Sequence, residues 1–310
     1  MLNLEKTNKS LKKTLIAFII FLIVVGIWKP LALVYGIQRG GLYSLIGLPL
    51  ALILGIVGIL NLAHGDFLTL GLYIGYIFYS SWSIDPIISM IPLFFILFGL
   101  GTVLYSILIK NVLKAGHLNQ LLLTFGISMI IIELIKIIWT TRPRSVYTSY
   151  ASSSVTLGNM SIGMYEFIYP AMAIAVLVIL QFFLKKTRLG QAASAVGQNP
   201  KGAEIVGINT NVVYLVVFSI AFGIIGISAA VMLPRTAIFP LSGNSYTLKS
   251  FALAAMAGLG NLNGILIGGI TLGIAEAIVQ SIPGYEGWSD VVFFGILIAV
   301  ILLNAYRRPE

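Results

Sequence analysis

Apolar runs about as long as a bilayer is thick recur along the chain, and they constrain its fold more than any other feature. A helix needs roughly 20 apolar residues to cross the ~30 Å hydrocarbon core of a membrane. Hydrophobic residues occupy 58% of the 310 positions and charged residues only 9%, against about 25% charged residues in a soluble domain. The composition therefore excludes the soluble classes and predicts an all-α, polytopic transmembrane protein.

The apolar runs predict about eight to nine spanning or partly spanning helices within a single domain, residues 1–310. The expected segments are 14–28, 37–58, 65–81, 87–109, 118–138, 166–184, 212–233, a broken Gly-rich pair at 249–258 and 264–280, and 291–306. The first segment has the basic start of a signal peptide, but no small-residue cleavage site follows its apolar core. We therefore expect this segment to stay in the protein as an uncleaved helix.

Basic residues orient the helices, because Lys and Arg concentrate in cytoplasmic loops. Four lysines precede the first helix, and other basic residues follow at 110–114, 185–201 and 307–308; seven more lie outside or buried. The termini and residues 185–211 are then cytoplasmic, and residues 140–164 form an external loop long enough to meet an extracellular partner. All four tryptophans fall at external helix ends, which they favour: Trp28, Trp82, Trp139 and Trp288. We expect a multi-pass protein of a bacterial-type cytoplasmic (inner) membrane.

Three polar residues, Asn61, His64 and Asp66, interrupt an apolar background where an uncompensated polar group costs several kcal/mol. Two interpretations stay open. The group is either a polar hinge near the translocation path, or a turn in which Asn61 caps a helix and Asp66 favours its N-terminus. No metal site is expected, because one His and one Asp do not make a ligand set and Cys is absent.

The hydrophilic island 185–211 predicts a small helical knob in the cytoplasm. Asn199 and Pro200 are typical of an N-cap and a first-turn proline, Gly207 of a helix end, and Gly190–Val196 of another helical turn or two. Its alanines leave a smooth surface that can sit in a groove of another protein, whereas an ordinary solvated loop would carry more charge. We therefore expect an ATPase-coupling segment formed by Gly190, Ala192, Ala195, Asn199, Pro200, Ala203 and Gly207.

A Gly-rich stretch, 251–277, predicts a broken helix of the kind that transporters place around a pore. Small residues four apart, such as Gly260 and Gly264, favour close helix crossing. The interruption adds Gly258, Gly260, Asn261 and Asn263 to Asn61, His64 and Asp66 as candidate residues of the translocation path.

Isolated charges offer few sites for chemistry. Glu133 and Lys136 lie three apart, so they could neutralise each other on the inner face of one helix. Glu276 is expected to stand alone near an external helix end. The chain has no Walker A motif, nucleophile elbow or zinc motif, so we expect a non-enzymatic transport subunit without a cofactor of its own.

Four segments resemble the signature segments of permeases of branched-chain amino acid ABC importers, the LivH type. They are residues 61–71, 121–131, 188–209 and 255–277, in the family's order, within a resemblance that covers about 37–306. It implies the ABC importer permease fold. It also implies a second permease, two cytoplasmic ATPases that bind ATP and Mg, and an extracytoplasmic solute-binding protein. Two departures are the extra N-terminal helix, within residues 1–36, and Asn263, where the family often carries Pro.

The expected function is translocation of branched-chain or related small amino acids by an ATP-driven importer. Urea, short amides or another small polar solute remain alternatives. An ATP-independent carrier or channel is an alternative of another class, for which only Glu133 and Glu276 are candidate embedded carboxylates. We attribute the net charge of +9 to basic residues that orient the protein in a membrane with anionic lipids, and not to nucleic-acid binding. The sequence leaves open the solute, its contact residues, a homo- or heterodimeric permease pair, and the role of the extra helix.

Overall fold

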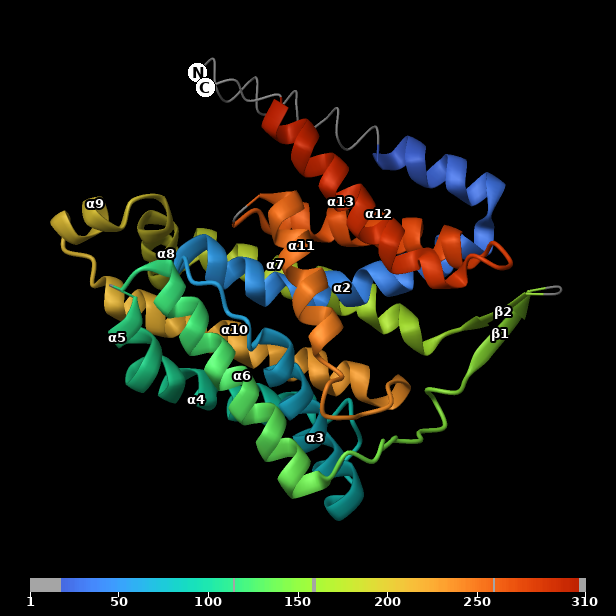
Figure 1. The fold of residues 1–310 in the computed structure, drawn as a ribbon, viewed down its shortest axis with the longest axis horizontal. Coiled ribbons are helices and arrows are strands. Elements are labelled where there is room, and N and C mark those ends of the chain that lie inside the picture. Colours follow the sequence, from blue (N-terminus) through green and yellow to red (C-terminus); the bar gives the residue numbers. More distant parts are fainter. Residues whose placement is uncertain (1–17, 114, 158–159, 259, 307–310) are drawn as a thin grey trace.

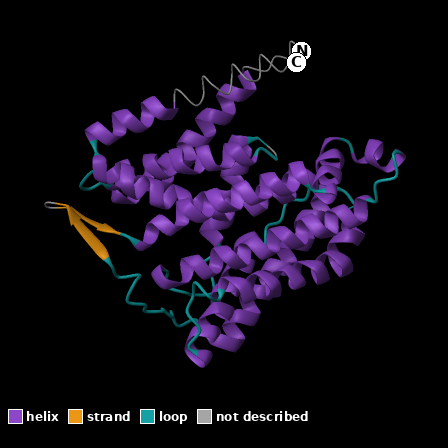
Figure 2. Ribbon diagram, turned by 180° about the vertical axis from the view of Figure 1, so that it is seen from behind, coloured by secondary structure: helices purple, strands orange, loops and turns teal. Residues whose placement is uncertain are grey.

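The computed structural model describes residues 18–113, 115–157, 160–258 and 260–306, and almost all of them are helical (Figures 1 and 2). After an apolar helix at Phe18–Trp28, the helices are α2 (Pro30–Ile56), α3 (His64–Trp82), α4 (Met90–Leu104), α5 (Lys110–Val112), α6 (His117–Trp139), α7 (Ile168–Lys186), α8 (Arg188–Gln198), α9 (Pro200–Ile205), α10 (Thr210–Met232), α11 (Asn244–Ala257), α12 (Leu262–Gln280) and α13 (Ser289–Tyr306). A π-helical turn, Tyr105–Ile109, joins α4 to α5, and 3-10 turns lie at Tyr165–Phe167, Leu233–Arg235 and Glu286–Trp288.

Six of the described helical segments are long and apolar enough to cross a membrane, and they begin at Pro30, Met90, His117, Tyr165, Thr210 and Leu262. The prediction of an all-α, multi-pass membrane protein is confirmed. The predicted number of eight to nine spans is not, because Phe18–Trp28, α3, α11 and α13 fall outside that group.

The N-terminal boundary differs from the prediction. Pro30 occupies the first turn of α2, where its fixed φ suits a helix start. Residues 30–36 therefore belong to α2 and not to the additional helix, of which the structure describes Phe18–Trp28. Several basic residues used for orientation lie outside the described residues: Lys6, Lys9, Lys12, Lys13, Lys114, Arg307 and Arg308.

The predicted external loop 140–164 contains a β-hairpin that the sequence did not reveal. Strands β1 (Ser154–Leu157) and β2 (Met160–Gly163) pair antiparallel and project from the bundle (Figure 1). Two side chains of α2 tie β2 down: Tyr35 Oη donates to the carbonyl of Ser161 and Gln38 Nε2 to that of Gly163, each at 2.8 Å. We name this side of the bundle the hairpin end, and the side that carries α8 and α9 the knob end.

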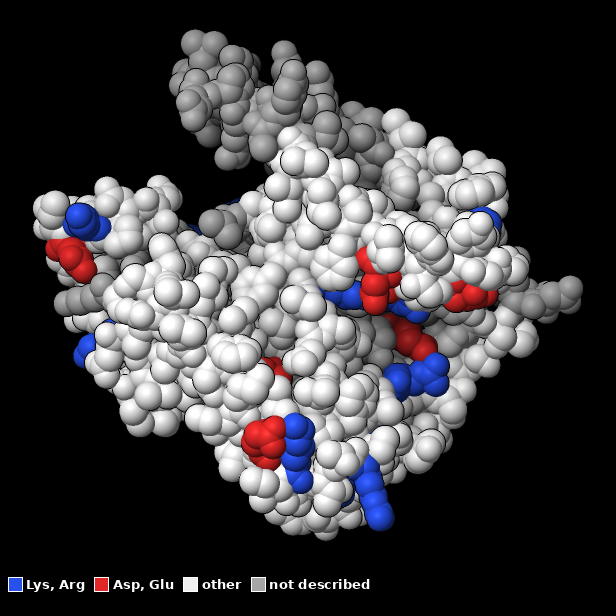
Figure 3. Space-filling view, in the orientation of Figure 1, with Lys and Arg blue, Asp and Glu red and all other residues white. Residues whose placement is uncertain are grey.

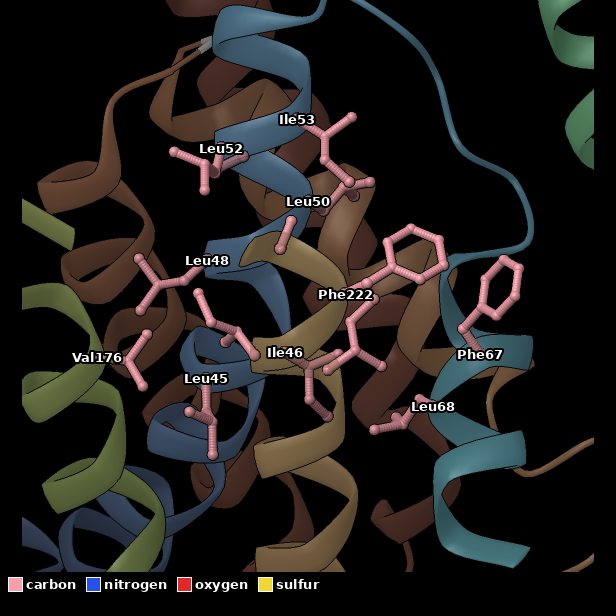
Figure 4. Close-up of a cluster of buried hydrophobic side chains, with 14 of the residues drawn as sticks. Leu45, Ile46, Leu48, Leu50, Leu52, Ile53, Phe67, Leu68, Val176 and Phe222 are labelled. Atoms are coloured by element: carbon pink, nitrogen blue, oxygen red, sulfur yellow. The ribbon is translucent and has the colours of Figure 1, made fainter. Parts of the chain in front are cut away.

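Helices α2 and α10 form the centre of the bundle. Their most apolar windows are 83% and 78% buried, against 22–33% for α4, α6 and α7. Helix α12 packs along α2, and α4 packs along α10. Figure 4 shows side chains of α2, from Leu45 to Ile53, meeting Phe67 and Leu68 of α3, Val176 of α7 and Phe222 of α10.

Two helices begin inside the molecule rather than at its surface. His64, the first residue of α3, bonds through Nε2 to the carbonyl of Ile46, at 2.8 Å. Ile46 lies ten residues before the end of α2, or about 15 Å at 1.5 Å per residue. Residues 57–63 therefore turn back into the bundle before α3 begins (Figure 4). Helix α11 starts at the same depth, because the Gly65 amide donates to Thr247 Oγ1 at 2.8 Å.

These two inner helix starts have matching sequences and contacts. Residues 65–69 and 243–247 both have the pattern Gly-x-x-x-Thr. A Cβ on Gly65 would meet the backbone of Gly243, and a Cβ on Gly243 would meet the backbone of Gly65. The order long helix, re-entrant segment, helix that begins inside the bundle, outer helix occurs once as α2–α3–α4 and once, running oppositely, as α10–α11–α12. Inverted halves of this kind are typical of transporters.

Candidate functional site

The knob consists of two short helices joined by a shared cap. Thr187 Oγ1 accepts from the Gly190 amide and begins α8, whereas Asn199 Oδ1 accepts from the Gly202 amide and begins α9, each at 3.0 Å. Gly207 has φ +85°, which favours glycine. The predicted cap and stop are confirmed. Helix α8, at eleven residues, is longer than the predicted turn or two.

The predicted coupling residues do not share one surface. Gly190 and Ala203 are buried, and Gly190 packs against the backbone of Phe183 at the end of α7. Ala192 and Ala195 are half-buried, so only Asn199, Pro200 and Gly207 are fully at the surface.

The most exposed apolar residues of the knob escaped the sequence analysis. Ile205 and Val206, at the end of α9, are 86% and 75% exposed, at the tip of a segment that projects from the bundle (Figure 1). The signal was present, since two adjacent β-branched residues close a short helix in an otherwise hydrophilic stretch. An exposed apolar patch outside the membrane-spanning segments is typical of a protein or membrane interface.

The knob touches the helix break through three glycines. Gly197 of α8 lies against the carbonyl oxygen of Gly55 at the end of α2, and Gly55 lies against Gly260, between α11 and α12. Gly260 has φ +76°, so both its conformation and the close approach require glycine. A cavity of about 250 Å³ surrounds this glycine junction. A displacement of α8 therefore acts directly on both α2 and the break.

The other candidate residues of the break between α11 and α12 have structural roles at the ends of these helices or contact α7. Asn261 Oδ1 accepts from the Gly264 amide and begins α12, at 3.1 Å. Asn263 Oδ1 accepts from Gln181 Nε2 of α7 at 2.6 Å. Gly258 has φ +87° and ends α11. All of them lie at the knob end.

The candidates Asn61, His64 and Asp66 lie elsewhere, packed inside the bundle at the start of α3. Asn61 Oδ1 accepts from the Ala63 amide at 3.2 Å, but Ala63 holds the N-cap position, so the expected cap by Asn61 is wrong. Among the described residues three buried atoms here have no hydrogen-bond partner: Asn61 Nδ2, His64 Nδ1 and Asp66 Oδ1. The structure therefore divides the predicted translocation residues between the bundle centre and the knob end.

Glu276 is not alone, as the sequence suggested, but lies at the centre of a buried charge cluster near the hairpin end. Tyr43 Oη donates to it at 2.6 Å and Lys249 Nζ at 3.1 Å, and Arg39 Nη1 lies 3.7 Å away. Lys249 Nζ also pairs with Asp290, at 3.0 Å. These residues come from α2, α11, α12 and α13, which are remote in sequence.

A cavity of about 610 Å³ lies beside this cluster, between α2, α7, α11, α12 and the turn after α10. Figure 3 shows acidic and basic side chains gathered around a hollow in this part of the face, while other charged side chains on it lie further apart. The polar lining residues are Tyr35, Gln38, Arg39, Glu166, Tyr169, Arg235, Thr236, Tyr246, Gln280 and Ser281. We name it the outer cavity.

Glu133 and Lys136 form the expected pair, with Oε1 and Nζ 2.6 Å apart, but not on the inner face of α6. Their side chains are 59% and 34% exposed. The prediction of an inward-facing pair is wrong, because the narrow face that α6 buries carries Gln120, Thr124 and Ser128 instead.

Sequence comparison places the chain among transport proteins. The profile of the family described as "Branched-chain amino acid transport system / permease component" matches residues 32–301. That description names a transport component and no enzymatic activity.

Individual relatives cover nearly the whole chain. BraD of Pseudomonas aeruginosa, a high-affinity branched-chain amino acid permease, is 26% identical over 294 residues, covering 90% of this chain and 95% of its own. LivH of Salmonella typhimurium is 26% identical, covering 89% and 94%. The probable LivH of Methanocaldococcus jannaschii is 23% identical, covering 79% and 81%. No solved structure matches the chain. The profile match extends over most of the sequence, and the chain belongs to the branched-chain amino acid permease family.

Proposed function

We propose that this chain is the membrane-spanning permease subunit of an ATP-driven importer for branched-chain amino acids. The family match and the relatives' activities support the substrate class. The observation that carries the ATP-driven mechanism is the exposed tip of α9, formed by Ile205 and Val206. A permease that works alone has no need of an apolar surface held away from the bilayer.

The knob supplies a route from an ATPase to the transport path. A partner that binds α8 and α9 displaces Gly197. This residue has no side chain, so its backbone contacts Gly55 and moves directly against it. Gly55 passes the displacement on to the break between α11 and α12. The backbone contacts of Gly197 with Gly55 and of Gly55 with Gly260 form the path for this displacement.

The proposed assembly contains this permease, a second homologous permease, two ATPases that bind ATP and Mg, and an extracytoplasmic binding protein. The knob faces the cytoplasm of a bacterial-type inner membrane, as do both termini, and the hairpin end faces outward. Of the coupling residues named from the sequence, the exposed Asn199, Pro200 and Gly207 then belong to the docking surface, with Ile205 and Val206 as its tip. The buried Gly190 and Ala203 support this surface from beneath.

An ATP-independent carrier would need an embedded carboxylate free to bind the coupling ion. Among the described residues Glu133 is paired with Lys136 and Glu276 with Lys249, so neither carboxylate named for the alternative function stands uncompensated. Asp66, buried at the start of α3 and without an ion pair among the described residues, is the carboxylate that such a carrier would use.

Affinity purification of the tagged chain in mild detergent, with mass spectrometry of its partners, tests the proposal. Wild type is expected to recover a second permease and ABC ATPases. Ile205→Asp, which puts a charge on the docking tip, should lose the ATPases and retain the second permease. Val155→Asp, at a 45% exposed position on the external hairpin, serves as the matched control and should retain both. Recovery of no ATPase with wild type, or full recovery with Ile205→Asp, would contradict the proposal.

A further inference from the structure

We propose that the outer cavity is a binding site for the zwitterionic head of an α-amino acid, with Arg39, Arg235 and Glu166 as its charged contacts. The inference rests on the proposed function and adds a site on the permease itself. It follows from three features of the cavity: the charges of both signs at its wall, its unused hydrogen-bonding groups and its apolar lining.

The outer cavity presents charges of both signs at its wall, from Arg39, Arg235 and Glu166. Ion pairs link Arg235 to Glu166 and Arg39 to Glu276, and Lys249 lies behind the wall with Glu276. Lys29 reaches the wall through its hydrogen bond to Ser281. A wall that carries both signs is complementary to a ligand with one charge of each sign. A neutral solute such as urea would need none of these charges.

Several groups at the wall keep hydrogen-bonding capacity. Arg235 Nε donates to Glu166 Oε1 at 2.7 Å, and Nη2 of the same guanidinium contacts the same oxygen. Within the described part of the chain, Arg235 Nη1 makes no hydrogen bond, and neither do Nε and Nη2 of Arg39, whose Nη1 is held by Gln280 and Glu276. Guanidinium N–H groups are the preferred partners of a carboxylate.

The Glu166–Arg235 pair gives the zwitterion a place to insert. The ligand ammonium replaces the guanidinium at Glu166, while the ligand carboxylate takes the released N–H groups of Arg235 and those of Arg39. One ion pair is thereby exchanged for two without a change in net charge. The hydroxyl of Tyr169, a residue 95% buried at the cavity wall, makes no hydrogen bond to any described group and offers another contact.

The remaining wall suits an aliphatic side chain. Leu31, Ala32 and Leu42 of α2 and Ala277 of α12 line the cavity. Its volume of about 610 Å³ lies within the range of small-molecule sites, which is roughly 300–1,000 Å³. The combination of two unlike charges and an apolar wall describes a branched-chain amino acid better than a polar amide.

Cysteine protection tests the site directly, because the chain has no cysteine of its own. Ser281→Cys places one thiol at the cavity wall of the full-length protein in lipid nanodiscs, and Ser81→Cys, at the exposed end of α3, is the control. The rate of labelling by a charged thiosulfonate is measured with L-leucine, with leucinamide, which lacks the carboxylate, and with 4-methylpentanoate, which lacks the ammonium.

Leucine is expected to slow labelling of Ser281→Cys and to leave Ser81→Cys unchanged. Leucinamide, 4-methylpentanoate, and leucine on a Glu166→Gln background should each protect roughly tenfold less well, the effect of one lost charge-assisted hydrogen bond. Equal labelling with and without leucine, or equal protection by all three compounds, would overturn the assignment. A complex can recover its ATPases and import leucine while leucine does not slow labelling of Ser281→Cys. That result would contradict this inference alone and leave the proposed function intact.

Discussion

At the scale of single residues, the fold depends on a few positions where a side chain does not fit. Gly65 and Gly243 let the first turns of α3 and α11 touch backbone to backbone inside the bundle. The Gly-x-x-x-Thr repeat that encodes this contact is visible in the sequence, but its meaning is not, because nothing in the sequence shows that the two segments lie at one depth.

Gly65→Ala should destabilise the protein by about 1–3 kcal/mol, the usual cost of overpacking a core. The added Cβ would meet the backbone of Gly243, which cannot move away as a flexible side chain can. Gly126→Ala, on an open face of α6 with no atom within 4 Å of the new Cβ, is the control. It should be neutral or slightly stabilising. Thermal unfolding in detergent measures the stability of both variants. Equal melting temperatures would contradict the close contact of α3 and α11 at Gly65 and Gly243.

Lys249→Met should destabilise the protein far more than Lys201→Met. The first leaves Glu276 buried without its closest cation, a loss of about 3–5 kcal/mol, whereas the second removes an exposed charge of the knob and should change stability by about 0.5 kcal/mol or less. Adding Glu276→Gln to Lys249→Met should recover part of the loss, because the unpaired charge is gone. The same unfolding assay decides, and similar losses for both lysines would show that the cluster is not buried in the membrane protein.

At the scale of elements, the sequence predicted most helices because long apolar runs have few other solutions in a bilayer. It could not reveal that α3 and α11 begin inside the bundle, since hydropathy records composition and not depth. The hairpin escaped notice because four-residue strands carry too little periodicity. The caps of the knob, Asn199 with Pro200, were predictable because capping depends on local chemistry alone.

Within the knob, Gly197→Val should uncouple transport while leaving the ATPases attached. The new side chain would push α8 away from Gly55, whose carbonyl oxygen lies 2.9 Å from the first added carbon. Leucine uptake should fall strongly in the assembled complex, while ATPase recovery in the affinity purification stays at the level of wild type. Gln191→Ala, on the exposed face of the same helix, should leave both unchanged. Normal uptake by Gly197→Val would remove the glycine junction from the transport route.

At the scale of the whole molecule, two inverted halves meet at the α3–α11 crossing, with the knob at one end and the outer cavity at the other. The sequence indicated the membrane class, the helix break and the helical knob, and the family comparison supports the same class. The charge cluster at Glu276 could not be predicted, because its partners lie as far as 237 positions away in sequence. The outer cavity is lined by residues from five parts of the chain. For the same reason, no single sequence motif predicted it.

The measurement that tests the central claim most directly is leucine uptake by the purified complex in proteoliposomes, with its binding protein outside and ATP either enclosed or omitted. The account predicts uptake only with hydrolysable ATP, and its loss in complexes prepared from Ile205→Asp. Leucine uptake without ATP would contradict it and would return the paired carboxylates Glu133 and Glu276 to consideration as coupling residues.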